Sequence, residues 1–149
     1  MKRISRSALL LTSLGVLLLI AAACAPATTS SNSITGIVWQ WTSVTEQSSG
    51  NTTTVPNPAN YTLVFNTDGT LNGTADCNSF AGTYSQQNGF TITLGPTTLA
   101  FCGEASLDTQ YLALLGSIAA GGPDGQGNLA LETAGGAQRM LFKNGGAAP

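Results

Sequence analysis

The stretch "GTADCNSFAGTYS", residues 73–85, holds a cysteine between an acid and an amide. Phe80, Gly82 and Tyr84 occupy alternate positions along its second half, and this period of two predicts a β-strand. Cys77 precedes that strand and follows another short polar-apolar run. A cysteine in such a place is a nucleophile, a metal ligand or half of a disulfide, and the three interpretations point to different classes of protein.

The segments on either side of this stretch predict antiparallel hairpins. "YTLVF" (residues 61–65) alternates as a strand does, and the Asp68-Gly69 pair after it supplies the positive φ of a tight turn. Asn88-Gly89 is a second signal of this kind, and the alternating segment "FTITLG" (residues 90–95) follows it. Because connections of hairpin length join these strands, we expect antiparallel pairing.

The N-terminal part of this pattern begins with "GIVWQWTSV", residues 36–44. Trp39 and Trp41 share one face of the predicted strand. We interpret them as residues of the core or its rim in preference to a cage for a ligand. Residues 46–60 have the composition of a loop, and Pro56 and Pro58 exclude a central strand there.

The apolar period becomes helical in "SLDTQYLALLGSI", residues 106–118. One face of the predicted helix carries Leu107, Tyr111, Leu114, Leu115 and Ile118. Ser106 is the expected N-cap, and Gly121-Gly122-Pro123 is the expected stop. Strands over residues 128–133 and 138–142 follow, joined by a turn at Gly135-Gly136.

This order of elements predicts a mainly β fold, a small antiparallel β-barrel-like domain with one α-helix. A sheet of about seven or eight strands with one apolar face tends to curl, and closure removes its unpaired edges. We expect the helix to cover an opening of the barrel or to pack against one face. A β-sandwich is the alternative.

The N-terminus predicts export and a lipid anchor. A basic start and an apolar run lead to "AAAC", so residues 1–23 are interpreted as a lipoprotein signal peptide and Cys24 as the lipidated residue. An ordinary secretory cleavage site and a retained anchor helix are the alternatives. Residues 24–35 predict a flexible tether, residues 36–143 the domain, and residues 144–149 a tail. The expected location is extracytoplasmic, at the membrane through the N-terminal lipid.

Charge and composition exclude several functions. Only Arg139 and Lys143 remain basic after residue 23, against all seven acidic residues, which leaves a net charge of −5. Such a chain cannot neutralise a run of phosphates, so nucleic-acid binding is excluded. The chain has no histidine, so a zinc site or an activated nucleophile lacks its usual partner. We therefore expect no metal and no cofactor.

The residues around Cys77 resemble a known family signature. "GTADCNSFAGTYS" is similar to the Gly-x-x-x-Cys-Asn-x-Phe-x-Gly-x-Tyr block of the META domain, also called HslJ-like or DUF306. "TTLAFCGE" (residues 97–104) resembles its second block, although Ala100-Phe101 departs from the usual Met-Ala before the cysteine. The helix segment "YLALL" and the opening "GIVWQW" are also similar, so the resemblance covers about residues 34–143.

The resemblance implies a compact barrel-like β fold with one helix and a disulfide between Cys77 and Cys102. It also implies structural roles for the remaining motif residues, which are Gly73, Asn78, Phe80, Gly82 and Tyr84. Members are often envelope lipoproteins, and the molecular activity of most is unassigned. Export agrees with the disulfide because oxidising compartments preserve such bonds. Closing the 24 intervening residues is worth about 3–4 kcal/mol in the chain-entropy model.

Three kinds of function remain at this point. A structural or interaction lipoprotein of the envelope, with a role in maintenance or stress tolerance, needs no cavity. The alternative is a small barrel that binds an apolar or lipid ligand, or that acts as a pilot or chaperone for an envelope partner. An enzyme is disfavoured, since its remaining candidate is a carboxylate pair formed by Asp76 and Glu104, and solvated turn residues account for both. A sealed core would favour the first function, and an open apolar pocket the second.

Overall fold

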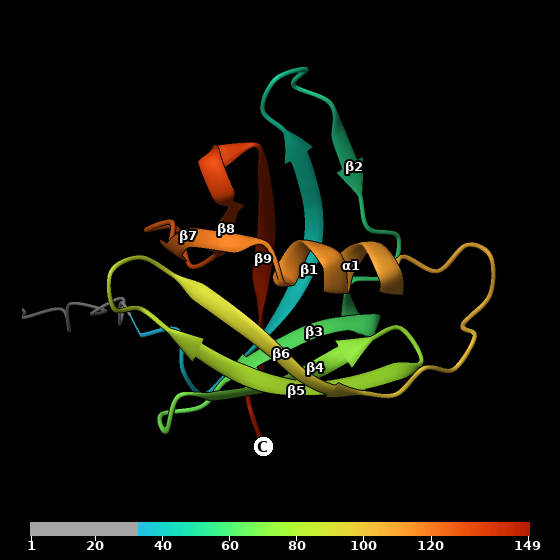
Figure 1. Cartoon of the computed structure of the whole chain (residues 1–149), viewed down its shortest axis with the longest axis horizontal. Helices are drawn as coiled ribbons and strands as arrows, with labels where there is room; N and C mark the ends of the chain where they lie inside the picture. The colour runs from blue at the N-terminus through green and yellow to red at the C-terminus, as the bar shows by residue number, and fades with distance from the viewer. Residues whose placement is uncertain (1–32) are drawn as a thin grey trace, which may run out of the picture.

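The computed structural model describes residues 33–149, in which one curled antiparallel sheet surrounds a single α-helix (Figure 1). The expected signal peptide, Cys24 and most of the expected tether lie outside the described residues. Within residues 33–149, no helix has the length and apolar character needed to cross a membrane. The elements are β1 (Ile37–Glu46), β2 (Thr52–Thr54), η1 (Pro58–Asn60), β3 (Tyr61–Phe65), β4 (Thr70–Ala75), β5 (Asn78–Ser85), β6 (Thr91–Thr97), α1 (Asp108–Leu115), β7 (Ile118–Pro123), β8 (Leu129–Thr133), η2 (Ala134–Gly136) and β9 (Gln138–Ala147).

The sheet has the order β6-β5-β4-β3-β1-β9-β8-β7, with β2 added on β1. Every pair of neighbouring strands is antiparallel, as the short connections require. The sheet curls until its two end strands approach each other, and there the Phe90 amide donates to the Ala119 carbonyl oxygen at 3.1 Å. The mainly β, barrel-like fold with one helix is thereby confirmed, in the form of a half-barrel.

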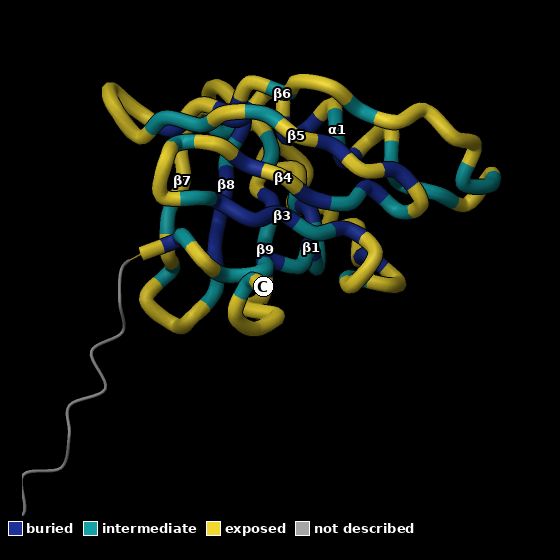
Figure 2. The backbone as a smooth tube through the Cα atoms, turned by 90° about the horizontal axis from the view of Figure 1, so that it is seen from below, coloured by how far each residue is buried: buried dark blue, intermediate teal, exposed yellow. Residues whose placement is uncertain are grey.

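The helix α1 packs into the concave side of the sheet and closes the core (Figures 1 and 2). Tyr111, on α1, is fully buried; its ring stacks on Trp41 at 5.1 Å and meets Tyr61 edge to face at 5.7 Å. The predicted apolar face of the helix is confirmed, since Tyr111, Leu114 and Leu115 are its buried residues. Trp39 and Trp41 lie in the core, as the sequence favours.

The strand β1 changes its inward face at a bulge. Trp41 is opposite Phe142 and Ser43 is opposite Leu141, so Thr42 has no opposite residue on β9. The unpaired residue shifts the alternation by one position, and Val44 is therefore buried along with Trp41.

Three local expectations are wrong. Residues 52–54 lie in the expected loop but form the edge strand β2, which ends before Pro56. The helix ends at Leu115, well before the expected stop, because Ile118–Pro123 forms β7. The strand β9 reaches Ala147, so residues 144–147 of the expected tail (144–149) belong to the sheet, with Asn144 opposite Trp39 and Ala147 opposite Ile37. Residues 98–103 lie in the loop that joins β6 to α1.

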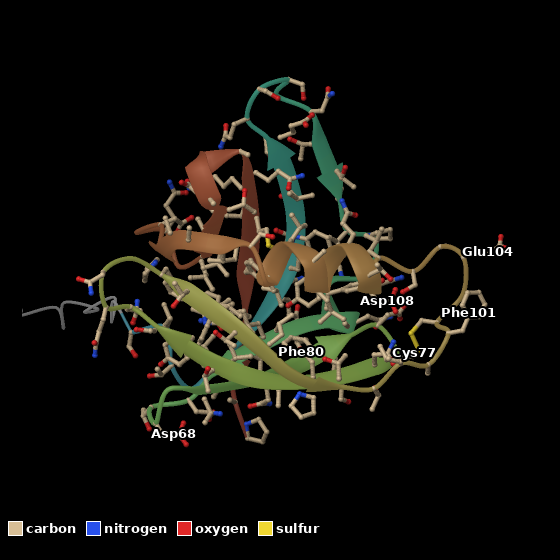
Figure 3. All side chains as sticks on the ribbon, viewed as in Figure 1. Asp68, Cys77, Phe80, Phe101, Glu104 and Asp108 are labelled. Atoms are coloured by element: carbon tan, nitrogen blue, oxygen red, sulfur yellow. A yellow bond between two sulfur atoms is a disulfide. The ribbon has the colours of Figure 1, made fainter. Side chains whose placement is uncertain are left out.

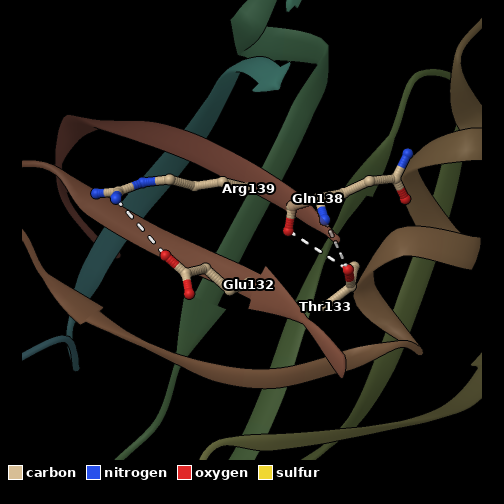
Figure 4. Close-up of polar contacts among 4 residues, drawn as sticks. All are labelled: Glu132, Thr133, Gln138 and Arg139. Carbon is tan, nitrogen blue, oxygen red and sulfur yellow. Dashed lines mark hydrogen bonds and ion pairs between the residues drawn. The ribbon is translucent and has the colours of Figure 1, made fainter. Parts of the chain in front are cut away.

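The hairpin of β8 and β9 ends in the short helix η2, whose Gly135 has a φ of 71° that favours glycine. Figure 4 shows the contacts on both sides of this turn. Thr133 accepts a hydrogen bond from the Gln138 amide at 3.0 Å, and Glu132 pairs with Arg139 at 3.5 Å across the two strands. Because both charged side chains are substantially exposed, the hydrophobic core, and not this ion pair, stabilises the hairpin.

Burial of Tyr111 makes the stability of the fold sensitive to alkaline pH. Burial raises the pKa of the Tyr111 phenol well above its ordinary value of 10.0. The unfolded chain therefore releases this proton above pH 10 while the folded chain keeps it, so the free energy of unfolding falls as pH rises. Urea unfolding between pH 9 and about 11 should show this fall, with a slope from this group of at most ~1.4 kcal/mol per pH unit.

The matched variant for this test is Tyr111→Phe. It loses the bond that the Tyr111 hydroxyl donates to the Thr62 carbonyl oxygen at 3.1 Å, so it is less stable at neutral pH by about 1 kcal/mol. Its stability should fall less steeply above pH 10 than that of the wild type. The residual slope comes partly from Tyr84, whose pKa is also raised, first by burial and then by the Asp68 charge. An unchanged slope in Tyr111→Phe would contradict the assignment.

Candidate functional site

The candidate site is the loop of residues 98–103 between β6 and α1, here called the pinned loop. Its Cys102 is bonded to Cys77, and the two Cα atoms are 5.5 Å apart. Cys77 lies in the two-residue turn between β4 and β5, after Asp76, which has a φ of 59° that aspartate tolerates better than most residues. Of the three interpretations of Cys77, the structure contains the disulfide.

Asn78 holds the pinned loop from beneath. This side chain is only 2 % exposed. Its Oδ1 accepts from the Ala100 amide at 2.8 Å and from the Thr98 hydroxyl at 3.0 Å, and its Nδ2 donates to the Ala100 carbonyl oxygen at 3.0 Å. The same Nδ2 lies 3.1 Å from Asp108 Oδ2, at the first residue of α1. The partners of Asn78 lie 20 to 30 residues further along the chain, so this side chain joins β5 to the pinned loop and to the helix start.

Tyr61 joins the other side of the disulfide turn to the helix. Its hydroxyl accepts from the Leu107 amide at 2.8 Å and donates to Asp76 Oδ2 at 3.4 Å. Asn60 donates to the other oxygen of Asp76 at 3.1 Å. The Asp76 carboxylate thus accepts structural hydrogen bonds, which agrees with its interpretation as a turn residue.

Ser106 is not the N-cap of the helix. The N-cap position belongs to Leu107, which makes no side-chain capping bond. The Ser106 hydroxyl still accepts from the Asp108 amide at 3.2 Å, so it satisfies one amide at the helix start. The side chains of Ser106 and Tyr61 share the capping that the sequence assigns to Ser106 alone.

The other motif residues lie where two strands must pass close together. Gly73 is opposite Phe80, and a Cβ on Gly73 would overlap the Thr62 carbonyl oxygen and the Phe80 ring. A Cβ on Gly82 would overlap the Thr93 carbonyl oxygen in the same way. Both glycines therefore permit close approach, which favours their structural interpretation.

Phe80, a core residue, and Tyr84, which is partly buried against the core, complete the motif. The Tyr84 hydroxyl donates to the Asn66 carbonyl oxygen at 2.9 Å, and its ring meets Phe65 at 4.7 Å. The Phe80 ring lies 6.0 Å from that of Tyr111 on α1. These contacts fasten β5 to the turn between β3 and β4 and to the helix.

The two acids that flank the cysteines face different hollows. Glu104 lines a pocket of about 590 Å³ with Asp108, whereas Asp76 lines a smaller one of about 190 Å³ with Tyr61. The structure therefore does not bring Asp76 and Glu104 together in one pocket. Within residues 33–149, no group of three or more acidic or cysteine side chains is placed to hold a metal ion.

Two large apolar side chains project from the pinned loop into solvent. Leu99 is 90 % exposed and Phe101 is 84 % exposed, and both line the 590 Å³ pocket. Figure 3 shows Phe101 and Glu104 on the outer side of the loop, beyond Cys77 and Asp108. The pinned loop thus presents apolar groups next to an acidic rim on a rigid base.

Sequence reasoning did not identify Tyr61, Leu99 or Phe101 as site residues. Tyr61 was placed only in a strand pattern, and its hydroxyl contact with Leu107 spans 46 residues, so no local signal reports it. Leu99 and Phe101 alternate as strand residues do, and their pattern does not distinguish exposed from buried positions.

Together these features describe a small curled β-domain, closed by one helix, whose disulfide fastens the hairpin turn to the loop before the helix. This chain belongs to the META domain family, whose sequence model matches residues 32–146. Comparison with solved structures finds a DUF4847 family protein from Bacteroides vulgatus ATCC 8482, with a TM-score of 0.58 and 13 % identity over 74 % of this chain and 93 % of that chain. That likeness supports the fold alone. No curated protein matches the chain.

Proposed function

We propose that this chain is a membrane-anchored lipoprotein of the cell envelope in which the META domain has a non-catalytic interaction role. The observation that carries the proposal is the combination of a filled core and an exposed, rigid apolar loop. Trp41, Tyr111 and Phe65 are fully buried inside the curl, so side chains occupy the space that a lipocalin-like ligand would need. The open pocket lies outside the curl, at the pinned loop.

The chemistry of the chain supports a non-catalytic role. Its sequence contains no histidine, and both cysteines of the described domain are in the disulfide. A nucleophile would therefore lack its usual activating base, and neither Cys77 nor Cys102 has a free thiol to act as one. The alternative of a barrel that encloses an apolar ligand loses support because the core is filled. Its second form, a pilot or chaperone for an envelope partner, agrees with the exposed loop.

The anchor is tested with Cys24→Ala. The sequence "AAAC" follows an apolar run, so loss of the cysteine should release the mature protein from the membrane fraction into the soluble fraction. The measurement is cell fractionation followed by a carbonate wash, with the wild-type chain as control. If the variant still sediments with membranes and resists the wash, a lipid on Cys24 is not the attachment.

A further inference from the structure

We propose that the pinned loop and the pocket beside it form a docking site for an apolar protein segment that carries a neighbouring Lys or Arg. This inference rests on the proposed interaction role and names the chemistry of the partner. Leu99 and Phe101 are the apolar contacts, and Glu104 and Asp108 supply the charge that the basic residue would meet. Aromatic residues, Phe included, are enriched in protein–protein interfaces relative to the rest of the surface.

The fixed backbone of the pinned loop supports a binding role for its exposed apolar side chains. The disulfide fixes Cys102, Asn78 binds both backbone groups of Ala100, and the Thr98 amide donates to the Ser79 carbonyl oxygen at 3.0 Å. Leu99 and Phe101 lie between these fixed points. Because the backbone is already ordered, association loses less conformational entropy than it would from a mobile loop.

The charge of the site selects a basic partner. Glu104 and Asp108 line the pocket, and no Lys or Arg is among its lining residues. Both basic residues of the described domain, Arg139 and Lys143, lie on β9. A Lys or Arg beside an apolar side chain would therefore meet complementary charge, whereas an acidic segment would be repelled.

The position of the loop favours a protein over the anchoring membrane. In Figures 1 and 2, the chain enters the described domain at residue 33 at one end of its long axis, and the pinned loop lies at the other end. An acidic rim would also be repelled by anionic headgroups. The loop is thus turned away from the side on which the proposed tether begins.

The pocket has the size for a short segment. Its volume of about 590 Å³ lies within the ~300–1,000 Å³ that is usual for binding pockets. A contact confined to this pocket and two projecting side chains is smaller than a standard interface, so we expect a transient complex.

Site-directed photocrosslinking of the full chain in its own cells tests the site. Phe101 is replaced by p-benzoylphenylalanine, and the control probe stands at Gln87, an exposed residue in the turn between β5 and β6. Irradiation should attach a protein at position 101 and not at position 87. Mass spectrometry of the crosslinked peptide should place the bond in an apolar segment with a Lys or Arg within a few residues.

A second pair of variants tests the chemistry. Leu99→Ser and Glu104→Lys change exposed side chains, so the melting temperature should stay within about 2 °C of the wild type. Each should reduce the adduct at position 101 about tenfold, the size typical of an important interface residue.

Several results would overturn the site: a lipid adduct at position 101, an adduct that both variants leave unchanged, or a crosslinked segment without a basic residue. A protein adduct at position 87 alone would remove this site and keep the interaction role. No protein adduct at either position would count against the interaction role as well, while the Cys24→Ala result would still decide the anchor.

Discussion

Loss of the Cys77–Cys102 disulfide is expected to lower the free energy of unfolding by about 3–4 kcal/mol. The bond joins residues 25 apart in sequence, so its removal restores the conformational entropy of a loop of that length to the unfolded chain. A folded domain of this size is stabilised by ~5–15 kcal/mol, so the loss is a large share of the total. We expect the melting temperature to fall on the order of 10–20 °C.

The controls for this prediction are the two single variants, the double variant and the reduced wild type. Cys77→Ser and Cys102→Ser should each cause a similar fall, and the double variant should lose little more than either, because one bond accounts for the effect. The wild type in excess reductant should match the double variant. Two titratable thiols in unfolded, unreduced protein from its native compartment would contradict the structural role.

Gly73→Ala is expected to destabilise the domain by about 3 kcal/mol, at the upper end of the range for overpacking. The new Cβ would meet the Thr62 carbonyl oxygen, which belongs to the neighbouring strand and cannot move aside as a side chain can. It would also lie 2.7 Å from the Phe80 ring, inside normal contact distance. Relief requires β3 and β4 to separate locally, which weakens the centre of the sheet.

Gly122→Ala is the matched control. Gly122 also lies in a strand, β7, but a Cβ there would meet nothing within 4 Å. Its substitution should leave stability within about 1 kcal/mol of the wild type, because it also restricts the unfolded chain. Chemical denaturation of both variants gives the comparison. Equal losses in the two would show that Gly73 contributes only a general strand effect.

The hairpins and the helix were predictable from local pattern. Alternation and the Asp68-Gly69 turn identify β3 and β4 because both signals lie within a few residues. The strand β7 was missed because its Ala and Gly residues have low β-propensity and resemble a helix stop. Gly121 is required there for another reason, since a Cβ would lie 2.6 Å from the Ala130 carbonyl oxygen on β8.

The site was less predictable than the fold. The cysteine pair and Asn78 were singled out through the family motif, but the partners of Asn78 depend on how the chain folds back on itself. The exposure of Leu99 and Phe101 has no local signal, because burial depends on what the rest of the chain places above a residue. Long-range contacts of this kind are beyond what composition and period can specify.

The pairing of the first long strand with the last has a consequence for synthesis. Residues Ile37 to Glu46 of β1 pair with β9, whose residues leave the ribosome about a hundred residues later. Because translation adds roughly 5–20 residues per second, β1 is made on the order of 5–20 s before this partner. The hairpins from β3 to β6 can form meanwhile, but the two central strands cannot join until translation has passed residue 147. β1 can pair with β3 during synthesis, but the complete sheet forms only after the last strand has been made.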